Sequence, residues 1–198
     1  MKTIQARTGK YQIGFILISW RIKAGHDRLY IPLMAPTPAI KIQPAVEADG
    51  HAVLACLAQA FAPYRQYYSA EAFLNTTLCL ETLKYRMKNM LVLVAVNQSD
   101  GLIVGTVAYN VVNPEEGHLR GMVVLADWQG AGIAWQLLQY AEAELRLRQC
   151  SRVTLDTTAP LKRAIQFYER NGYRPSGKIT DFYGMPLFEY EKNWSEKS

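Results

Sequence analysis

The chain has 198 residues, of which 49% are hydrophobic and 20% are charged. This composition is ordinary for a globular protein and excludes a disordered or collagen-like chain. A chain of this length usually forms one domain with a hydrophobic core. The three cysteines, at positions 56, 79 and 150, form no Cys-x-x-Cys motif. We therefore expect reduced thiols and a cytoplasmic protein.

The net charge of +5 belongs to the N-terminal segment. Residues 1–38 carry six basic side chains and one acidic side chain, whereas residues 39–198 carry equal numbers of both. A nucleic-acid-binding domain needs an excess of basic side chains on its own surface, so the charge indicates no nucleic-acid partner. We therefore divide the chain into a basic extension, residues 1–38, and a single domain, residues 39–198.

The extension holds one apolar run, residues 13–20, which is too short to span a membrane. Arg21 and Lys23 follow this run directly, and no small-x-small cleavage site is present, which is unlike a signal peptide. We interpret residues 1–38 as a loosely ordered appendage or as sequence upstream of a start at Met34. Both are preferred to a targeting segment, and no membrane partner is expected.

In the first half of the domain, residues 40–43 form a short strand that ends at Pro44. Apolar residues from 53 to 61 repeat at helical spacing, and the aromatic stretch 61–68 is interpreted as a loop. Ser69 is placed to cap a helix that runs to about residue 90. Three consecutive strands then follow, separated by turns: 91–96, 102–112 and 118–125.

The second half alternates strands with helices. A helix carries its apolar face from residue 134 to 145, a strand covers 152–156, and a second helix covers 161–170. Two closing strands are expected at 173–174 and 185–192. This order predicts the α/β class, with one mixed sheet and helices on its faces.

The most informative segment is the loop from Gln129 to Ala134 (QGAGIA), between a strand and a helix. Its glycines let backbone N–H groups approach a ligand, and the first turn of the helix leaves unpaired donors at the positive end of its dipole. The loop suits a pyrophosphate, although a plain strand-to-helix turn would use similar residues. No Gly-Lys-Ser/Thr follows, which excludes a Walker A loop. A Rossmann dinucleotide loop stays open as an alternative, although Trp135 takes its third glycine position.

Two motifs resemble those of the GNAT superfamily of acyl-CoA-dependent N-acetyltransferases. Gln129-x-x-Gly132-x-Ala134 is similar to its Q/R-x-x-G-x-G/A motif, and Tyr168-x-x-x-Gly172-Tyr173 is similar to a later Tyr-x-x-x-Gly-aromatic motif. The resemblance spans residues 39–192. It implies the GNAT fold, a mixed and mostly antiparallel sheet with splayed central strands and helices on both faces.

The resemblance also implies acetyl-CoA as co-substrate and no metal. The loop would hold the pyrophosphate of coenzyme A, and the strand before it would pair with the pantetheine arm where Gly121 allows a bulge. The cofactor-binding residues implied in this way are Met122, Val123, Val124, Gln129, Gly130, Ala131, Gly132, Ile133, Ala134 and Trp135.

The implied reaction is direct attack of a primary amine on the acetyl thioester. Tyr168 matches the tyrosine that protonates the leaving thiolate in many family members, and a phenol with a pKa of about 10 carries the proton required. Many members carry an acidic general base on the strand where this sequence has Arg120-Gly121. The remaining candidates for the base are Glu116 and His118, acting through water.

The acceptor is expected to be a small-molecule amine or a peptide amine. Candidate acceptor-binding residues are Tyr64, Arg65, Tyr67 and Tyr183, of which Arg65 would suit a carboxylate. A monomer or a homodimer is expected. The alternative is a non-catalytic GNAT-like domain that binds or senses acyl-CoA, because the acidic residue is missing and Leu161 replaces a frequent family asparagine.

Overall fold

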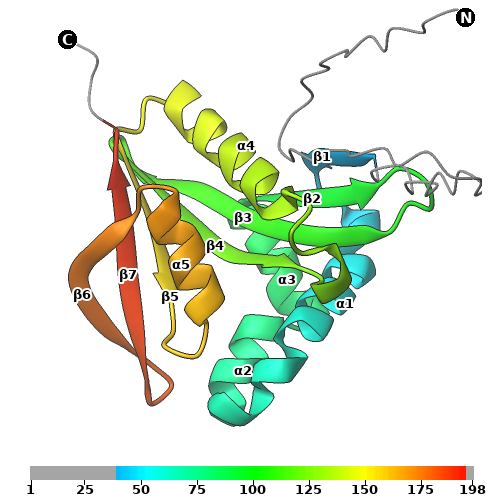
Figure 1. Ribbon diagram of the computed structural model, residues 1–198, viewed down its shortest axis with the longest axis horizontal. Coiled ribbons are helices and arrows are strands. Elements are labelled where there is room, and N and C mark those ends of the chain that lie inside the picture. Colours follow the sequence, from blue (N-terminus) through cyan, green and yellow to red (C-terminus); the bar gives the residue numbers. More distant parts are fainter. Residues whose placement is uncertain (1–38, 195–198) are drawn as a thin grey trace, which may run out of the picture. The chain divides into compact units, whose positions relative to one another are not determined.

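The computed structural model describes residues 39–194, so the predicted extension lies outside the described residues. A seven-stranded sheet has the order β1-β2-β3-β4-β5-β7-β6 (Figure 1). Neighbouring strands are antiparallel except β4 and β5, which are parallel. The strands are β1 (Ile40–Pro44), β2 (Leu91–Asn97), β3 (Ile103–Asn113), β4 (Glu116–Val124), β5 (Arg152–Thr157), β6 (Arg174–Phe182) and β7 (Met185–Asn193).

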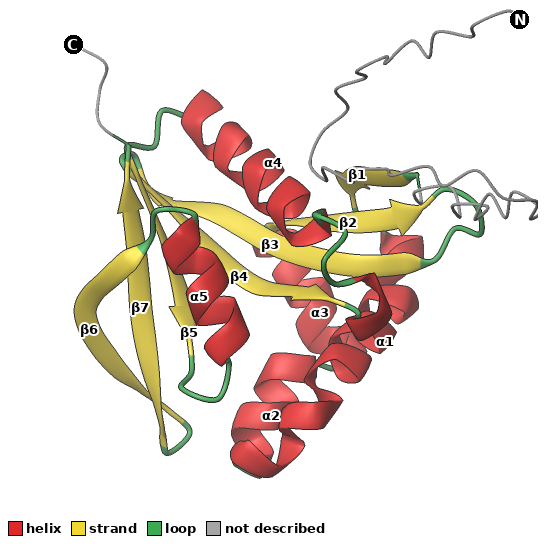
Figure 2. Ribbon diagram, in the orientation of Figure 1, coloured by secondary structure: helices red, strands yellow, loops and turns green. Residues whose placement is uncertain are grey.

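Helices cover both faces of the sheet (Figure 2). They are α1 (Gly50–Phe61), α2 (Ala70–Thr77), α3 (Leu80–Asn89), α4 (Ile133–Leu147) and α5 (Lys162–Arg170). On one face, the buried side chains of α4, such as Leu138, pack with those of the strands and of α5. On the other face, Leu57 of α1 and Leu83 of α3 pack against Val94 of β2. The predicted mixed sheet with helices on both faces is confirmed.

The predicted helix from Ser69 to about residue 90 is wrong in one respect, because two helices occupy this stretch. Ser69 does cap the first helix, its hydroxyl accepting a hydrogen bond from the N–H of Ala72 at 3.2 Å. The chain then breaks at Leu78, whose φ is +63°. Thr77 donates its hydroxyl proton to the carbonyl of Phe73. Threonine side chains that bond to the backbone in this way compete with helix continuation.

Two further predictions need correction. The stretch 61–68, interpreted as a loop, contains a 3-10 helix from Ala62 to Tyr67, whose first turn accepts Pro63. Strand β6 extends to Phe182 rather than ending at residue 174. It is a mostly exposed edge strand, so it lacks the apolar alternation from which a strand is recognised.

The central strands β4 and β5 pair only at their beginnings. Their parallel register runs from Glu116 opposite Arg152 to Leu119 opposite Leu155, and β4 continues unpaired toward its C-terminal end on this side. Gly121, with a φ of +64°, lies at a bulge opposite β3. The predicted bulge is confirmed, and it coincides with the point at which β4 leaves β5.

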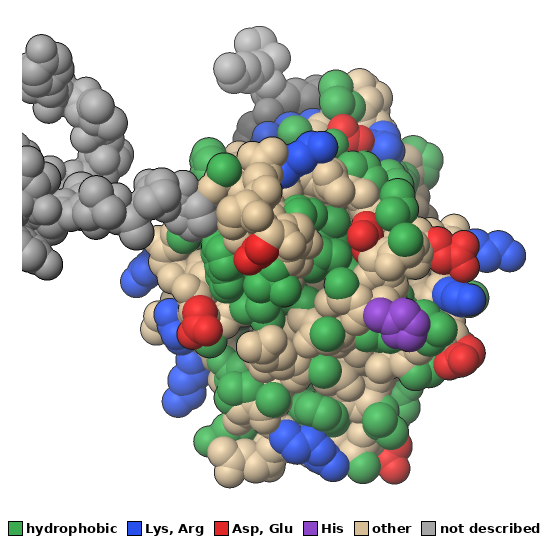
Figure 3. Space-filling model, turned by 90° about the vertical axis from the view of Figure 1, so that its right-hand side faces the viewer, with side chains coloured by type: hydrophobic (Ala, Val, Ile, Leu, Met, Phe, Trp, Pro, Cys, Tyr) green, Lys and Arg blue, Asp and Glu red, His purple; other side chains and the backbone are tan. Residues whose placement is uncertain are grey.

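The antiparallel run β2-β3-β4 contradicts the Rossmann alternative, which requires repeated parallel βαβ units. All three cysteines are unpaired thiols, as predicted. Among residues 39–194, no helix is long and apolar enough to cross a bilayer. On the face shown in Figure 3, acidic and basic side chains are interspersed without a continuous basic surface.

Candidate active site

A cavity of about 400 Å³ lies where β4 leaves β5, against the first turns of α4 and α5. Its wall comes from α1 and the following 3-10 helix, the end of β4, the glycine loop and α5. The residues that line it are Ala60, Phe61, Tyr64, Met122, Val123, Val124, Trp128, Gln129, Gly130, Gly132, Ile133, Ala134, Trp135, Leu161, Arg163, Ala164, Phe167 and Tyr168. Most of the predicted cofactor-binding residues therefore share one cavity; Ala131 lies in the same loop.

Two left-handed glycines shape the loop. Gly130 and Gly132 have φ values of +87° and +78°, and a Cβ on either would meet nothing within 4 Å. The backbone conformation, rather than a lack of space, requires glycine here. Left-handed residues that alternate with right-handed ones turn successive backbone N–H groups toward one side, which makes a concavity for an anion. Helix α4 begins directly after Gly132, and its positive end adds to this site.

Gln129 and Trp135 have different parts in this loop. The Gln129 amide donates a hydrogen bond to the carbonyl of Val124 at 3.0 Å, so it ties the loop back to the end of β4. Trp135 is 54% exposed although it lines the cavity. An exposed aromatic ring at the mouth of a cavity offers a flat surface to a ligand.

Tyr168 lies inside the cavity on α5, and its ring contacts the Tyr173 ring edge to face. Burial raises the pKa of the Tyr168 hydroxyl above its ordinary value. Within the described part of the chain, this hydroxyl has no hydrogen-bond partner. Tyr168 therefore presents a protonated hydroxyl that is free to donate to a ligand.

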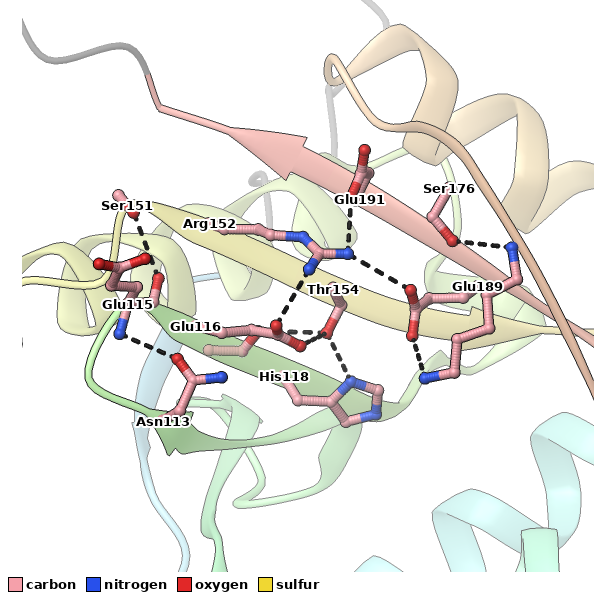
Figure 4. A network of polar contacts seen from close by, with 12 residues as sticks. Asn113, Glu115, Glu116, His118, Ser151, Arg152, Thr154, Ser176, Glu189 and Glu191 are labelled. Carbon is pink, nitrogen blue, oxygen red and sulfur yellow. Dashed lines mark hydrogen bonds and ion pairs between the residues drawn. The ribbon is translucent and has the colours of Figure 1, made fainter.

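The two predicted base candidates lie on β4, outside the residues that line the cavity, and belong to a polar network with β5 (Figure 4). His118 contacts the Thr154 hydroxyl through Nδ1 at 2.9 Å and the Asp156 carboxylate through Nε2 at 3.4 Å. The Glu116 carboxylate accepts hydrogen bonds from Arg152 and Thr154, both at 3.1 Å. Both Glu116 oxygens are thus engaged, whereas His118 pairs with a carboxylate that orients its ring.

The predicted acceptor-binding residues lie in three different surroundings. Tyr64 lines the cavity. Tyr67 and Tyr183 are exposed, and Tyr183 accepts a hydrogen bond on its hydroxyl from the Asn75 amide at 3.2 Å. Arg65 is engaged within the protein, because it donates to the Tyr68 carbonyl and stacks on the Phe73 ring. Its assignment to an acceptor carboxylate stays a prediction.

Several lining residues were missed from the sequence. Phe61 was placed on the apolar face of a helix, Trp128 was given no role of its own, and Leu161 was noted only as a departure from the family motif. Arg163 is exposed and lies in the first turn of α5. No other feature of the sequence marks it as a residue that lines the cavity. Only the fold reveals that these separate segments meet.

The cavity fits coenzyme A in its chemistry. The glycine loop supplies backbone donors for the pyrophosphate, and the unpaired side of β4 supplies backbone groups for the amides of the pantetheine arm. In the residues that the structure describes, no group of three or more His, Cys, Asp or Glu side chains forms a metal site.

Comparisons with known proteins agree with this geometry. The family model of the acetyltransferase (GNAT) family matches residues 56–173. The fold is similar to that of the PaiA N-acetyltransferase from Thermoplasma acidophilum, solved in complex with coenzyme A, with a TM-score of 0.66 and 18% identity over 79% of this chain and 99% of that one.

A second similar structure is the ribosomal-protein-S18-alanine N-acetyltransferase from Escherichia coli, with a TM-score of 0.64 and 19% identity over 81% of this chain and 97% of that one. A GNAT acetyltransferase from Staphylococcus aureus Mu50 gives a TM-score of 0.65 and 17% identity, over 79% of this chain and 100% of that one. No curated protein matches the sequence. Because the family model covers more than half of its residues, the chain belongs to the GNAT family of acetyltransferases, which use acetyl-CoA.

Proposed function

We propose that the protein is an N-acetyltransferase, which moves the acetyl group of acetyl-CoA onto a primary amine by direct attack. The observation that carries this proposal is the protonated and unpartnered Tyr168 hydroxyl in the cavity beside the glycine loop. Acetyl-CoA supplies an activated acetyl group as a thioester. Gly130 to Trp135 hold its pyrophosphate, and Met122, Val123 and Val124 pair with the pantetheine arm in this proposal.

The reaction requires two proton transfers. As the amine nitrogen bonds to the carbonyl carbon, the C–S bond breaks and Tyr168 gives its proton to the departing sulfur. The attacking nitrogen loses one proton, which His118 accepts through water. Asp156, at 3.4 Å from Nε2 of His118, stabilises the imidazolium that forms. Glu116 is the second candidate, although Arg152 and Thr154 already hold its oxygens. Positioning of the two reactants supplies much of the remaining rate enhancement.

The acceptor enters, in this proposal, between the 3-10 helix of Ala62–Tyr67 and the turn between β6 and β7. Tyr64 and Tyr183 border this opening, and its chemistry suits a small-molecule or peptide amine. We further propose that residues 39–198 form a single acetyltransferase domain and that the protein acts in the cytoplasm as a monomer or homodimer. Three free thiols support a reducing compartment.

The test is turnover of acetyl-CoA with a panel of primary amines, for the wild type and for Tyr168→Phe. We expect Tyr168→Phe to lower kcat by about a hundredfold or more, because a general acid contributes on that scale. Binding of coenzyme A, measured by calorimetry, should stay unchanged. Tyr85→Phe is the matched control, since the Tyr85 side chain is 73% exposed on α3.

Two results would contradict the proposal. Tight binding of coenzyme A without turnover of any amine would favour the acyl-CoA-binding or sensing domain. Equal activity of the Tyr168→Phe and Tyr85→Phe variants would remove Tyr168 as the proton donor.

A further inference from the structure

Two arginines converge beside the bulge of β4. Arg86 lies on α3, and an ideal Cβ placed on Gly121 would lie 2.7 Å from Arg86 Nη1. Arg120 precedes Gly121 in the chain. Burial, together with the charge of Arg120, lowers the pKa of Arg86 to about 10, which still leaves Arg86 charged at neutral pH. Arg120 is thus a like charge near the Arg86 guanidinium.

Neither arginine is neutralised within residues 39–194. No acidic side chain in that part forms an ion pair with Arg86 or Arg120. The recorded contact is a hydrogen bond from Arg120 Nη2 to the Asn75 amide oxygen at 2.9 Å. On the same face, the Asp156 carboxylate pairs with His118. Arg86 is half-buried, whereas Arg120 is exposed. A partly buried charge is usually paired, so an unpaired Arg86 beside a second cation is costly for the protein alone.

The arginines lie next to the proposed reaction centre. Met122, which follows Gly121, lines the cavity. Arg120 and His118 are two residues apart on β4 and so point to the same face of the sheet. Leu119 between them packs into the core on the α4 face. The cations therefore face the side on which α1, α2 and α3 lie, opposite the α4 face.

Asn75 links this pair to the predicted acceptor opening. Its amide oxygen accepts from Arg120, and its amide nitrogen donates to the Tyr183 hydroxyl. The Ser69 hydroxyl also donates to the Tyr183 carbonyl at 3.0 Å. Side chains from α2, β4 and the β6–β7 turn thus form one continuous wall that ends at the two arginines.

Given the proposed N-acetyltransferase function, we infer that the acceptor is a small amine that also carries a carboxylate, and that Arg86 and Arg120 bind this carboxylate. A planar guanidinium matches a carboxylate with two parallel hydrogen bonds. The anion removes the charge imbalance of the arginine pair and places the amine near the cavity. An amino acid, or an amino-acid-like metabolite with a more distant carboxylate, has this chemistry.

The test compares matched acceptors that differ only in charge. Each amino acid of a panel, including ω-amino acids, is compared with its own carboxamide at fixed acetyl-CoA. We expect kcat/KM to favour the carboxylate by about tenfold to a hundredfold, the scale of a charge-assisted hydrogen bond. The ratio of kcat/KM for α-amino acids to that for ω-amino acids then identifies the carboxylate position that the protein binds.

Three variants test whether the preference for carboxylate acceptors depends on the two arginines. Arg86→Met and Arg120→Gln should each abolish most of the preference, so that kcat/KM for each amino acid falls toward the value for its own carboxamide. Lys84→Gln removes an exposed cation from the same helix as Arg86 and should keep the full preference. We also expect Arg86→Met to be at least as stable to unfolding as the wild type, because it removes an unpaired cation; an arginine needed only for structure would destabilise the fold when replaced.

Calorimetric binding of the carboxylate amines to the protein with coenzyme A provides a readout that needs no turnover. Binding that depends on Arg86 and Arg120 supports the inference even if no acetyl transfer occurs, in which case the proposed function alone fails. Equal turnover of acids and carboxamides by the wild type overturns the inference and leaves the N-acetyltransferase proposal standing.

Discussion

The carboxylate of Glu142 accepts a hydrogen bond from the Tyr173 hydroxyl at 3.0 Å in the interior of the protein. Lys192 of β7 lies 2.9 Å from both oxygens of the same carboxylate. Glu142 is fully buried on α4, and Tyr173 follows the end of α5. One carboxylate therefore joins α4 to the segment that ends α5 and to β7, and these elements position two walls of the cavity.

We expect Glu142→Ala to lower the free energy of unfolding by about 3 kcal/mol or more, because it leaves Lys192 and the Tyr173 hydroxyl without their buried partner. Glu144→Ala is the control on the same helix, since Glu144 pairs with Arg148 near the surface. Both side chains of this pair keep part of their surface in solvent, 39% for Arg148 and 28% for Glu144, so the pair contributes about 1 kcal/mol or less. Urea denaturation of both variants measures the difference, and equal losses would show that the Glu142 network stabilises the fold no more than the Glu144–Arg148 pair does.

The Glu142 network also shows where sequence reasoning ends. The helical period of α4 and the strands around it follow from apolar spacing, because burial of one face dictates that spacing. From the sequence alone, Glu142, which follows Ala141, would be assigned to the polar face of the helix. Its burial depends on Lys192, fifty residues later, and no local pattern records such a partner. The break at Leu78 was missed for a related reason, since it depends on side-chain bonds to the backbone.

The residues of the candidate site also fall into those that the sequence identifies and those that it does not. The glycine loop was identified because a left-handed turn and a helix N-terminus need particular residues at fixed spacing. Tyr168 was identified only from the resemblance of its segment to a family motif. Arg86 and Arg163 were not identified, because a basic residue on an amphipathic helix usually lies in solvent. Only the position of α3 beside the bulge of β4 brings Arg86 to Gly121.

The conformation of Gly132 provides a second prediction. An alanine at φ +78° costs about 1–2 kcal/mol and shifts the loop that presents its N–H groups. We expect Gly132→Ala to weaken coenzyme A binding by about tenfold or more, the loss of one charge-assisted hydrogen bond. Gly101→Ala is the control, since Gly101 has a similar φ of +75° and equally open space in the β2–β3 turn. Calorimetry should show unchanged binding for Gly101→Ala, and equal weakening in both variants would refute a role of the loop.

The three thiols should differ in reactivity. Burial raises the pKa of Cys56 to about 12 and also raises that of Cys150, so both are almost entirely thiols at pH 8. Because the thiolate is the reactive form, we expect rapid labelling only of the exposed Cys79. Mass spectrometry of labelled peptides from the native protein checks this, and Cys79→Ser should remove the rapid phase. Rapid labelling of Cys56 in the native state would contradict its burial.

Glu189 on β7 makes stability depend on pH in a definite direction. Burial by itself raises the pKa of this carboxyl, but the hydrogen bond from Lys178 and the charges of Lys178 and Arg152 outweigh it, so the pKa lies below its ordinary value of 4.5. A carboxyl with a lowered pKa in the folded state stabilises the fold above the unfolded value. This contribution is therefore complete above pH 4.5 and is lost as the pH falls through the lowered pKa.

We expect Glu189→Gln to be less stable than the wild type at pH 7, and the difference to shrink as the pH falls below 4.5. Urea denaturation of both proteins at pH 7 and at several lower values measures this convergence. Glu47→Gln, which removes the exposed partner of Lys84 at 3.6 Å, should follow the wild type throughout. A constant difference between Glu189→Gln and the wild type at every pH would mean that Glu189 acts by packing and not by its charge, because only the ionised form is linked to protons.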